Sequence, residues 1–263
     1  GKSFIYNLIH SEWAGVKNFM FLIKSNDLFV ILRNTILYNL VFIVLGMVVS
    51  VGLAIMISLM RNKRASKVYQ TMMFFPYFMS WVVASYFLDA FLNQNNGLIN
   101  NMLRNSGQQP IQWYMTAGAW PAILTFMYLW KSTGYNMVIY LSSISGIDTT
   151  LYEAAVMDGA NKRQQVFHIT LPCLKNVIIM MFILNVGKIF YSDFGLFYQL
   201  SQGASGSIFK TTATIDTYIY NALRSSTIGM TSAAAFFQSV ACCITIILAN
   251  AIVKKFDEDS AII

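Results

Sequence analysis

Long apolar runs, separated by short polar segments, make up most of the chain. A helix that crosses the bilayer core needs about 20 mostly apolar residues, and windows of this length recur along the sequence. The five predicted spans are residues 34–60, 71–92, 119–141, 173–198 and 229–253. Alternating segments of about ten residues, which a lipid-exposed barrel would need, are not found in the pattern. We therefore predict an all-α fold, a polytopic bundle of transmembrane helices.

Composition places the chain in the same class. Of its 263 residues, 56% are hydrophobic and only 11% are charged, whereas soluble domains carry about 25% charged residues. A net charge of +7 would suggest a nucleic-acid partner for a soluble protein. In a membrane protein the basic residues are read loop by loop instead. We expect membrane lipid around this chain and no nucleic acid.

The segment "RNKRASK" (61–67) lies directly at a predicted helix end and sets the orientation. Placing it in the cytoplasm puts 142–172 and the tail 254–263 there too, and leaves 1–33 outside. Lys and Arg divide almost equally between the two sides, but the inside segments are shorter and therefore denser in basic residues, as the positive-inside rule requires. The sequence starts at Gly1 without a basic and apolar leader. An extracellular start predicts an earlier span, and about six spans in the intact chain.

The cysteines and histidines form no site of familiar spacing. Cys173, Cys242 and Cys243 fall inside predicted spans, and an odd count within lipid gives no disulfide framework. We expect them to be packing residues. His10 and His168 are too few and too far apart for a metal site. Neither a disulfide nor a metal is predicted.

A polar segment rich in small residues interrupts the apolar pattern between residues 150 and 172. Its "TLYE" places Thr150 three residues before Glu153, which is the spacing of a capping box. This spacing predicts a short helix that starts at Leu151.

The rest of this segment predicts a turn and a second helix. Ala154 and Ala155 favour the first helix and leave one face nearly flat, while Gly159 permits a turn that residues with a Cβ resist. "NKRQQVFHI" (161–169) then predicts a second short helix, and Pro172 suits the first turn of the following span. An ordinary amphipathic loop is the alternative interpretation of such a helix–turn–helix.

Spacing favours a more specific interpretation. Glu153-Ala154-Ala155, Gly159, Ile169 and Leu171-Pro172 match, at every position, the cytoplasmic "EAA" signature of binding-protein-dependent ABC importer permeases. The segments that also resemble permeases for complex carbohydrates are "WAGVKNF" (13–19), "NTILYNLVFIVLGMVVSVGLAIMIS" (34–58), "FFPYFMSWVV" (74–83), "NNGLIN" (95–100), "WKSTGYNMVIYLSSISGID" (130–148) and "IDTYIYN" (215–221). The chain thus resembles the type I sugar-importer family, polysaccharide and oligosaccharide branch, over nearly its whole length.

The resemblance implies a transport subunit of the bacterial cytoplasmic membrane that works by alternating access. Residues 34–253 would form the permease domain, paired with a second homologous permease subunit. An extracellular or lipid-anchored sugar-binding protein would deliver the cargo, and two cytoplasmic ATPase subunits would bind ATP and Mg²⁺. The chain contains no GxxxxGK[ST] phosphate loop, so ATP hydrolysis is expected in the partners and no cofactor in this chain.

By resemblance, the first helix of the polar segment is the coupling helix that docks in a cleft of the ATPase. Glu153 would be its polar anchor, a role compatible with local capping, and Gly159 would set the bend. The residues assigned to ATPase coupling are Glu153, Ala154, Ala155, Asp158, Gly159, Leu171 and Pro172. Asp158 suits either a partner contact or a solvated surface. For Lys162, Arg163 and His168 we expect a solvated surface.

Polar residues within the spans are candidates for the translocation pathway, because an unpaired charge in lipid costs several kcal/mol. Lys131 lies in the polar turn "KSTG", where the alternative is snorkelling to an interface. Lys188 and Asp193 interrupt a predicted span, where the alternatives are an ion pair or an interfacial position. The family usually has a small residue at the position of Lys188, which weakens any transfer of function to it.

Aromatic side chains near polar neighbours complete the pathway candidates, because pyranose rings stack on aromatic faces while their hydroxyls bind amides and carboxylates. These candidates are Trp81, Tyr86, Tyr135, Asn136, Tyr191 and Phe194, with lipid-facing or core packing as the alternative for each aromatic. The cargo implied is an oligosaccharide or polysaccharide fragment of unspecified charge. The competing functions are an ABC permease for another small solute and, less in keeping with the spacing, a membrane-embedded enzyme or scaffold.

Overall fold

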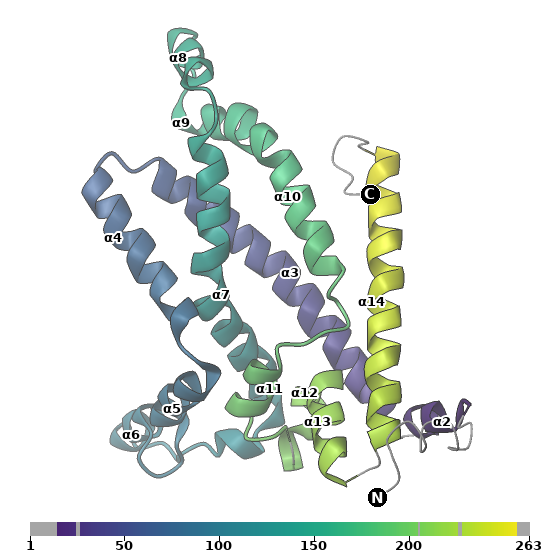
Figure 1. The fold of residues 1–263 in the computed structure, drawn as a ribbon. Coiled ribbons are helices and arrows are strands. Elements are labelled where there is room, and N and C mark those ends of the chain that lie inside the picture. Colours follow the sequence, from purple (N-terminus) through teal and green to yellow (C-terminus); the bar gives the residue numbers. More distant parts are fainter. Residues whose placement is uncertain (1–14, 25–26, 205, 226–227, 257–263) are drawn as a thin grey trace, which may run out of the picture.

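The computed structural model describes residues 15–24, 27–204, 206–225 and 228–256, and every regular element in these ranges is a helix (Figure 1). The α-helices are α2 (Lys17–Lys24), α3 (Leu28–Ser58), α4 (Lys63–Phe74), α5 (Trp81–Leu92), α6 (Leu98–Asn105), α7 (Trp120–Ser145), α8 (Thr149–Met157), α9 (Lys162–Gln165), α10 (Leu171–Val186), α11 (Phe194–Leu200), α12 (Phe209–Thr212), α13 (Ile215–Ser225) and α14 (Ile228–Phe256). Tighter or wider turns are η1 (Phe75–Phe78), η2 (Trp113–Met115), η3 (Ala117–Ala119), the π-helical η4 (Val166–Thr170) and η5 (Gly206–Ile208). The predicted all-α class is confirmed.

Three helical segments of the described residues are long and apolar enough to cross a membrane. They are Leu28–Ser58, Lys162–Val186 and Gly229–Lys255. Lys63–Phe78 and Trp81–Leu92 together would make a fourth, bent by 100°. α7 is 26 residues long and falls on the predicted window 119–141, but its central polar turn makes it less apolar than the others. All five predicted windows lie on helices, and two of them have the wrong limits.

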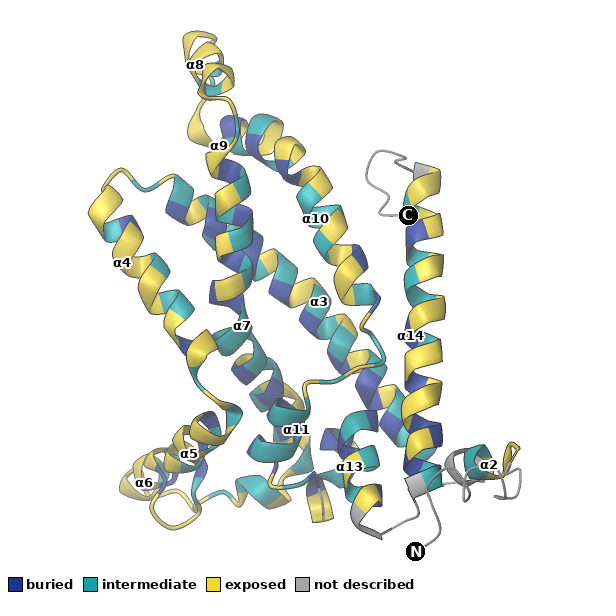
Figure 2. Cartoon of the chain, in the orientation of Figure 1, coloured by how far each residue is buried: buried dark blue, intermediate teal, exposed yellow. Residues whose placement is uncertain are grey.

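The pair α3 and α7 forms the centre of the bundle, where buried residues line the facing sides of both helices (Figure 2). Phe42 of α3 stacks on Tyr128 of α7 with ring centroids 4.0 Å apart. On another side of α7, a Cβ at Gly134 would overlap the backbone carbonyl of Met73 in α4. Glycine is therefore what allows α4 to approach α7 so closely.

The window 71–92 is wrong as a single straight span. The first half ends in η1 and the second half restarts as α5, with the 100° bend between them. Pro76 lies in η1 and has no backbone N–H to continue a helix. Met79 and Ser80 are extended, and the Ser80 hydroxyl accepts the Val83 N–H at 3.2 Å, which caps α5.

The window 173–198 is wrong at both ends. The helix is continuous from Lys162 to Val186, so α9, η4 and α10 form one rod rather than a short helix followed by a span. Pro172 lies inside this rod. The π-helical η4 directly precedes it and widens the helix where the proline ring would meet the carbonyl four residues earlier.

The rod ends at Gly187, where a Cβ would press against the Ile246 side chain of α14. A non-helical stretch follows, and the Asp193 carboxylate caps α11 by accepting the Leu196 N–H at 3.3 Å. The polar residues that interrupt the predicted span therefore mark a break in the helix rather than a buried charge cluster inside it.

The predicted inside and outside segments separate to opposite ends of the bundle. α8, α9 and the start of α4 lie at one end, and α6 with the end of α5 lies at the other (Figure 1). We call these the α8 end and the α6 end. Gly1 and Ile263, whose sides were also predicted, lie outside the described residues.

Candidate functional site

The polar segment folds as a projection at the α8 end, which we call the ledge (residues 148–172). α8 begins at Thr149 rather than Leu151, and its N-cap is Asp148 rather than Thr150, so the predicted capping box with Glu153 is wrong. The Asp148 carboxylate accepts the Thr150 N–H at 2.9 Å. Hydrogen bonds from the backbone and side chain of Thr150 lower the pKa of Asp148 below its ordinary value.

The turn after α8 is a Schellman motif centred on Gly159. The Ala160 N–H donates to the Ala155 carbonyl at 2.8 Å, and the Gly159 N–H donates to the Val156 carbonyl at 3.0 Å. Gly159 has φ +81°, which residues with a Cβ rarely adopt. The prediction that Gly159 sets the bend is confirmed, and its physical cause is the left-handed backbone.

Side-chain hydrogen bonds fasten α8 and its turn to the rod. The Tyr152 and Thr170 hydroxyls lie 2.9 Å apart, which joins α8 to η4. The buried Gln165 donates its amide to the Ala160 carbonyl at 3.0 Å. Asn161 and Gln164 form a reciprocal capping box at the start of α9. Two of these contacts connect α8 and its turn directly to the rod.

The outer surface of α8 is apolar and exposed. Leu151, Val156 and Met157 are all exposed large hydrophobic residues, with Met157 at 87%. Glu153 and Ala154 are exposed beside them. This mixture suits a docking surface better than a solvated one.

The remaining predicted coupling residues have other positions. Ala155 is half-buried and lines a hollow of about 270 Å³ with residues of α9 and η4, so it does not share the fully exposed position of Ala154. Asp158 is exposed at the end of α8. Leu171 packs half-buried against the core of α3, α7 and α10, whereas Pro172 is exposed.

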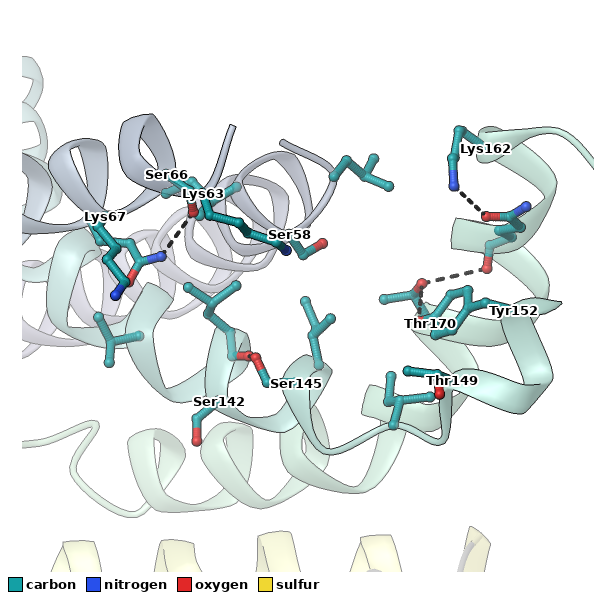
Figure 3. A pocket seen from close by; sticks show the side chains of 18 residues that line it. Ser58, Lys63, Ser66, Lys67, Ser142, Ser145, Thr149, Tyr152, Lys162 and Thr170 are labelled. Carbon is teal, nitrogen blue, oxygen red and sulfur yellow. Dashed lines mark hydrogen bonds between the residues drawn. The ribbon is translucent and has the colours of Figure 1, made fainter. Parts of the chain in front are cut away.

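A second hollow of about 590 Å³ lies between the ledge, α4 and the end of α7 (Figure 3). Its polar lining residues are Ser58, Lys63, Ser66, Lys67, Gln70, Ser142, Ser145, Thr149, Tyr152, Lys162, Gln165 and Thr170. Asp and Glu are absent from this lining in the part of the chain that the structure describes. We call it the basic hollow, because lysines from α4 and α9 line its opposite sides although the sequence separates them widely.

Lys131 lies at the bend between η1 and α5. Its Nζ donates to the Tyr77 carbonyl at 2.7 Å and to the Met79 carbonyl at 2.6 Å, which the bend leaves without helical partners. The ammonium also lies 5.5 Å from the centre of the Tyr77 ring and 5.3 Å from that of the Trp81 ring. Lys131 therefore supplies hydrogen bonds to backbone carbonyls that the bend between η1 and α5 leaves without helical partners.

The bend is tied to α11 by a second contact. The Trp81 indole N–H donates to the Asp193 carboxylate at 2.7 Å. A Cβ at Gly195 would overlap the Trp81 ring, so glycine is needed where α11 meets α5. We call Lys131, Trp81, Asp193 and the carbonyls of Tyr77 and Met79 the bend lock. The Asp193 carboxylate thus accepts the Trp81 N–H, and it does not form the ion pair with Lys188 that the sequence left open.

The other pathway candidates are less concentrated. Tyr135 stacks on Tyr77 with centroids 4.6 Å apart, next to the bend lock, and Asn136 is half-buried on the same helix. Phe194 stacks on Tyr198. Tyr191 lies 3.1 Å from the Ser239 hydroxyl of α14, and Lys188 is exposed after the rod.

Known proteins identify the fold and the family. The family model described as "Binding-protein-dependent transport system inner membrane component" matches residues 43–258. The chain belongs to this family. It is a membrane-embedded transport permease, and the resemblance found in the sequence is confirmed.

Two kinds of relative support the same assignment. The permease is 31% identical to the polygalacturonan/rhamnogalacturonan transport system permease protein YteP of Bacillus subtilis (strain 168), covering 96% of this chain and 78% of that protein. It also superposes with a TM-score of 0.87, at 26% identity, on a bacterial ABC transporter involved in the import of the acidic polysaccharide alginate, covering 97% of this chain and 91% of that chain. A complex of a bacterial alginate ABC transporter with an alginate pentasaccharide-bound periplasmic protein matches with a TM-score of 0.86 and 26% identity, over 96% and 88% of the two chains.

Sequence reasoning missed a hollow of about 480 Å³ between α5, α11 and η2, at the α6 end. Its lining residues are Val82, Ser85, Tyr86, Asp89, Asn93, Tyr114, Tyr198, Gln199, Gln202 and Gly203. We call it the tyrosine hollow. Burial, and then the nearby Asp89 charge, raise the pKa of Tyr114 to about 12, so its hydroxyl stays protonated and can donate. Only Tyr86 was predicted, although aromatic and amide residues are dense in both 85–93 and 198–202.

A polar junction around Asp216 was also missed. Its carboxylate accepts the Ser192 N–H at 2.6 Å and the Ser192 hydroxyl at 2.7 Å, and the Gln238 amide lies 3.1 Å away. These contacts join α13, α14 and the stretch after the rod. The motif "IDTYIYN" contained the residue, but nothing in its spacing indicated these partners.

Proposed function

We propose that the permease is one subunit of an ATP-driven importer of the bacterial cytoplasmic membrane, and that it carries an oligosaccharide or polysaccharide fragment. α8 is the coupling helix, and it docks on one of two cytoplasmic ATPase subunits that bind ATP and Mg²⁺. A second permease subunit completes the pathway, and an extracellular sugar-binding protein delivers the cargo. The sugar transport named for YteP and the pentasaccharide-bound periplasmic protein in the related complex support these assignments.

The observation that carries the proposal is the exposed apolar surface of a helix that cannot be stable alone. α8 has nine residues, and isolated helices of fewer than about 12 residues are marginal in water. Leu151, Val156 and Met157 nevertheless stay exposed. Docking on a partner would order the helix and bury these side chains at the same time.

The ledge is built to transmit movement in both directions along the bundle. Tyr152 and Thr170 connect α8 to the rod, and α8 follows α7 after a short turn at Gly146. α7 carries Lys131, which holds the bend of the neighbouring span. We infer that ATP-driven displacement of α8 reaches the bend lock through α7, and that release of the lock opens or closes the pathway.

The experiment places a carboxylate on the docking surface by the substitution Met157→Asp. Burying that charge against a partner costs several kcal/mol, so we expect the ATPase subunits to co-purify at least tenfold less and sugar uptake to fall in parallel. Met102→Asp is the matched control, because Met102 is also an exposed methionine, at 59%, but lies on α6 at the opposite end. Wild-type co-purification and uptake for Met157→Asp would refute the coupling role.

A further inference from the structure

The tyrosine hollow combines the groups that recognise sugars. Tyr86, Tyr114 and Tyr198 supply aromatic faces, and Tyr86 is 73% exposed to the surface. Asp89 and Gln199 supply a carboxylate and an amide, and the Asn93 amide donates to the Asp89 carboxylate at 3.2 Å and so positions it. Aromatic faces pack against the apolar faces of sugar rings, while amides and carboxylates bind hydroxyls. A pocket of this composition fits a glycosyl unit.

The charges around the hollow disfavour a carboxylated sugar. Asp89 is its charged lining residue, and neither Lys nor Arg lines it in the described ranges. Arg104 of the adjacent α6 is committed to the carbonyls of Gln94 and Asn95, at 2.6 and 2.5 Å. Lys131 is likewise committed to the bend. A uronate would therefore meet a like charge without a basic partner, which is unfavourable in a partly desolvated pocket.

Backbone strain fixes one wall of the hollow. Gln202 has φ +53° and Ala204 has φ +51°, values that residues with a Cβ adopt rarely. The turn is held because the Gly203 N–H donates to the Tyr198 carbonyl and the Ala204 N–H donates to the Ser201 hydroxyl, both at 2.8 Å. Such strain tends to persist where a side chain must be positioned for function. Here it places Gln202 in the lining.

The hollow also lies next to the proposed gate. Val82 and Ser85 line it, and they follow Trp81 of the bend lock directly on α5. Its other wall is the end of α11, whose start is capped by Asp193. A sugar bound there would contact both helices that the bend lock joins.

We propose that the tyrosine hollow binds an uncharged glycosyl unit of the cargo on the α6 side of the bend lock. The inference rests on the proposed sugar-import function and deepens it, because it assigns the cargo a neutral sugar. It separates this permease from the related importer of the acidic polysaccharide alginate. Asp89 accepts hydrogen bonds from hydroxyls, and the tyrosine rings pack against the sugar.

The test measures glycan binding to the assembled transporter, purified with its ATPase subunits in lipid nanodiscs and without a binding protein. Saturation-transfer NMR compares neutral glucan, mannan and xylan pentasaccharides with polygalacturonate and alginate pentasaccharides. We expect saturation transfer from the protein to at least one neutral glycan. Tyr86→Ala should bind this glycan roughly three- to tenfold more weakly, because the packing of the aromatic ring against the sugar is lost. Tyr69→Ala is the matched control, since Tyr69 is an exposed tyrosine on α4 and does not line the hollow.

A charge variant tests the selectivity. Asp89→Asn should lower the preference for neutral over uronate glycans by about tenfold, because it removes a repulsive charge and weakens a charge-assisted hydrogen bond. Asp27→Asn removes a charge near the start of α3, away from the hollow, and should leave the preference unchanged. Binding restricted to uronates, or an unchanged preference in Asp89→Asn, would overturn the inference.

Transport data keep the two proposals apart. If the transporter imports uronates and Tyr86→Ala has no effect, the neutral-sugar inference fails while sugar import stands. If it imports no glycan of either class, the proposed function fails as well.

Discussion

The two ends of the permease have hollows of opposite character. The basic hollow at the α8 end is lined by Lys63, Lys67 and Lys162 with many hydroxyls and, among the described residues, no acid. The tyrosine hollow at the α6 end is lined by tyrosines, amides and Asp89, with no base from the same described part of the chain. The difference teaches that the linings of the two hollows are sorted by charge, although Lys and Arg divide almost equally between the predicted inside and outside segments.

This sorting depends on contacts between distant segments. Lys63 and Lys162 lie far apart in the sequence, yet both line the basic hollow because α4 and the ledge flank the end of α7 on opposite sides (Figure 3). Basic residues at one end are expected on the cytoplasmic side. The bend lock lies between the two hollows and holds the span that connects them.

The largest expected effect concerns which end faces the cytoplasm. In a variant whose three cysteines are replaced, we introduce Asn96→Cys at the α6 end and, separately, Asn62→Cys at the start of α4; both residues are exposed. An impermeant thiol reagent applied to intact cells should label Asn96→Cys and leave Asn62→Cys unlabelled, because only the α6 end is outside. Permeabilised cells provide the control in which both must react. Labelling of Asn62→Cys in intact cells would show that the α8 end faces outside and that the predicted orientation is wrong.

The next effect concerns the bend lock. Lys131→Met keeps the length of the side chain but removes the donor to the Tyr77 and Met79 carbonyls. Leaving partly buried acceptors unpaired costs about 1–3 kcal/mol, so we expect a lower melting temperature of the purified complex together with altered sugar uptake. Lys131→Arg retains a cationic donor and should recover part of both.

Melting temperature and sugar uptake together distinguish a role of Lys131 in gating the pathway from a purely structural role at the bend. Lower stability with wild-type uptake and ATPase coupling would show that Lys131 only braces the bend. Wild-type stability and uptake together would show that the two hydrogen bonds contribute little, and the bend would need another cause, such as Pro76 alone.

Apolar periodicity predicted the class and the approximate location of every span, because the bilayer imposes the length of each run. It could not predict the bend after η1, since the apolar pattern continues through Pro76 to Leu92 and only Lys131, distant in sequence, satisfies the broken backbone. The rod starting at Lys162 was also hidden. Pro172 normally marks a helix start, and a π turn that accommodates it has no simple sequence signal.

The ledge was predicted better than the pathway because its signals are local. Gly159 and the alanines act within one helix and its turn, so their spacing carries most of the information. The error at the N-cap was local too, since Asp148 precedes Thr150 by two residues and starts the helix earlier by accepting the Thr150 N–H. The tyrosine hollow instead combines α5, η2 and α11. No short motif contains those three elements.

The smallest expected effect concerns the α8 end, where the Asp148 side chain caps the start of α8. Asp148→Ala should increase hydrogen–deuterium exchange in α8, because the Thr150 N–H loses its acceptor. Since folding lowers the pKa of Asp148, its contribution is complete at neutral pH and is lost only as the pH falls below the ordinary aspartate value of 3.8. The ratio of the protection factors of Asp148→Ala and the parent, each corrected for the intrinsic exchange rate, should therefore be the same at pH 6 and pH 8. Asp148→Asn keeps a good cap and should exchange nearly like the parent at both pH values. A ratio of protection factors that changes between pH 6 and pH 8 would mean that another titrating group, and not this carboxylate, stabilises the ledge.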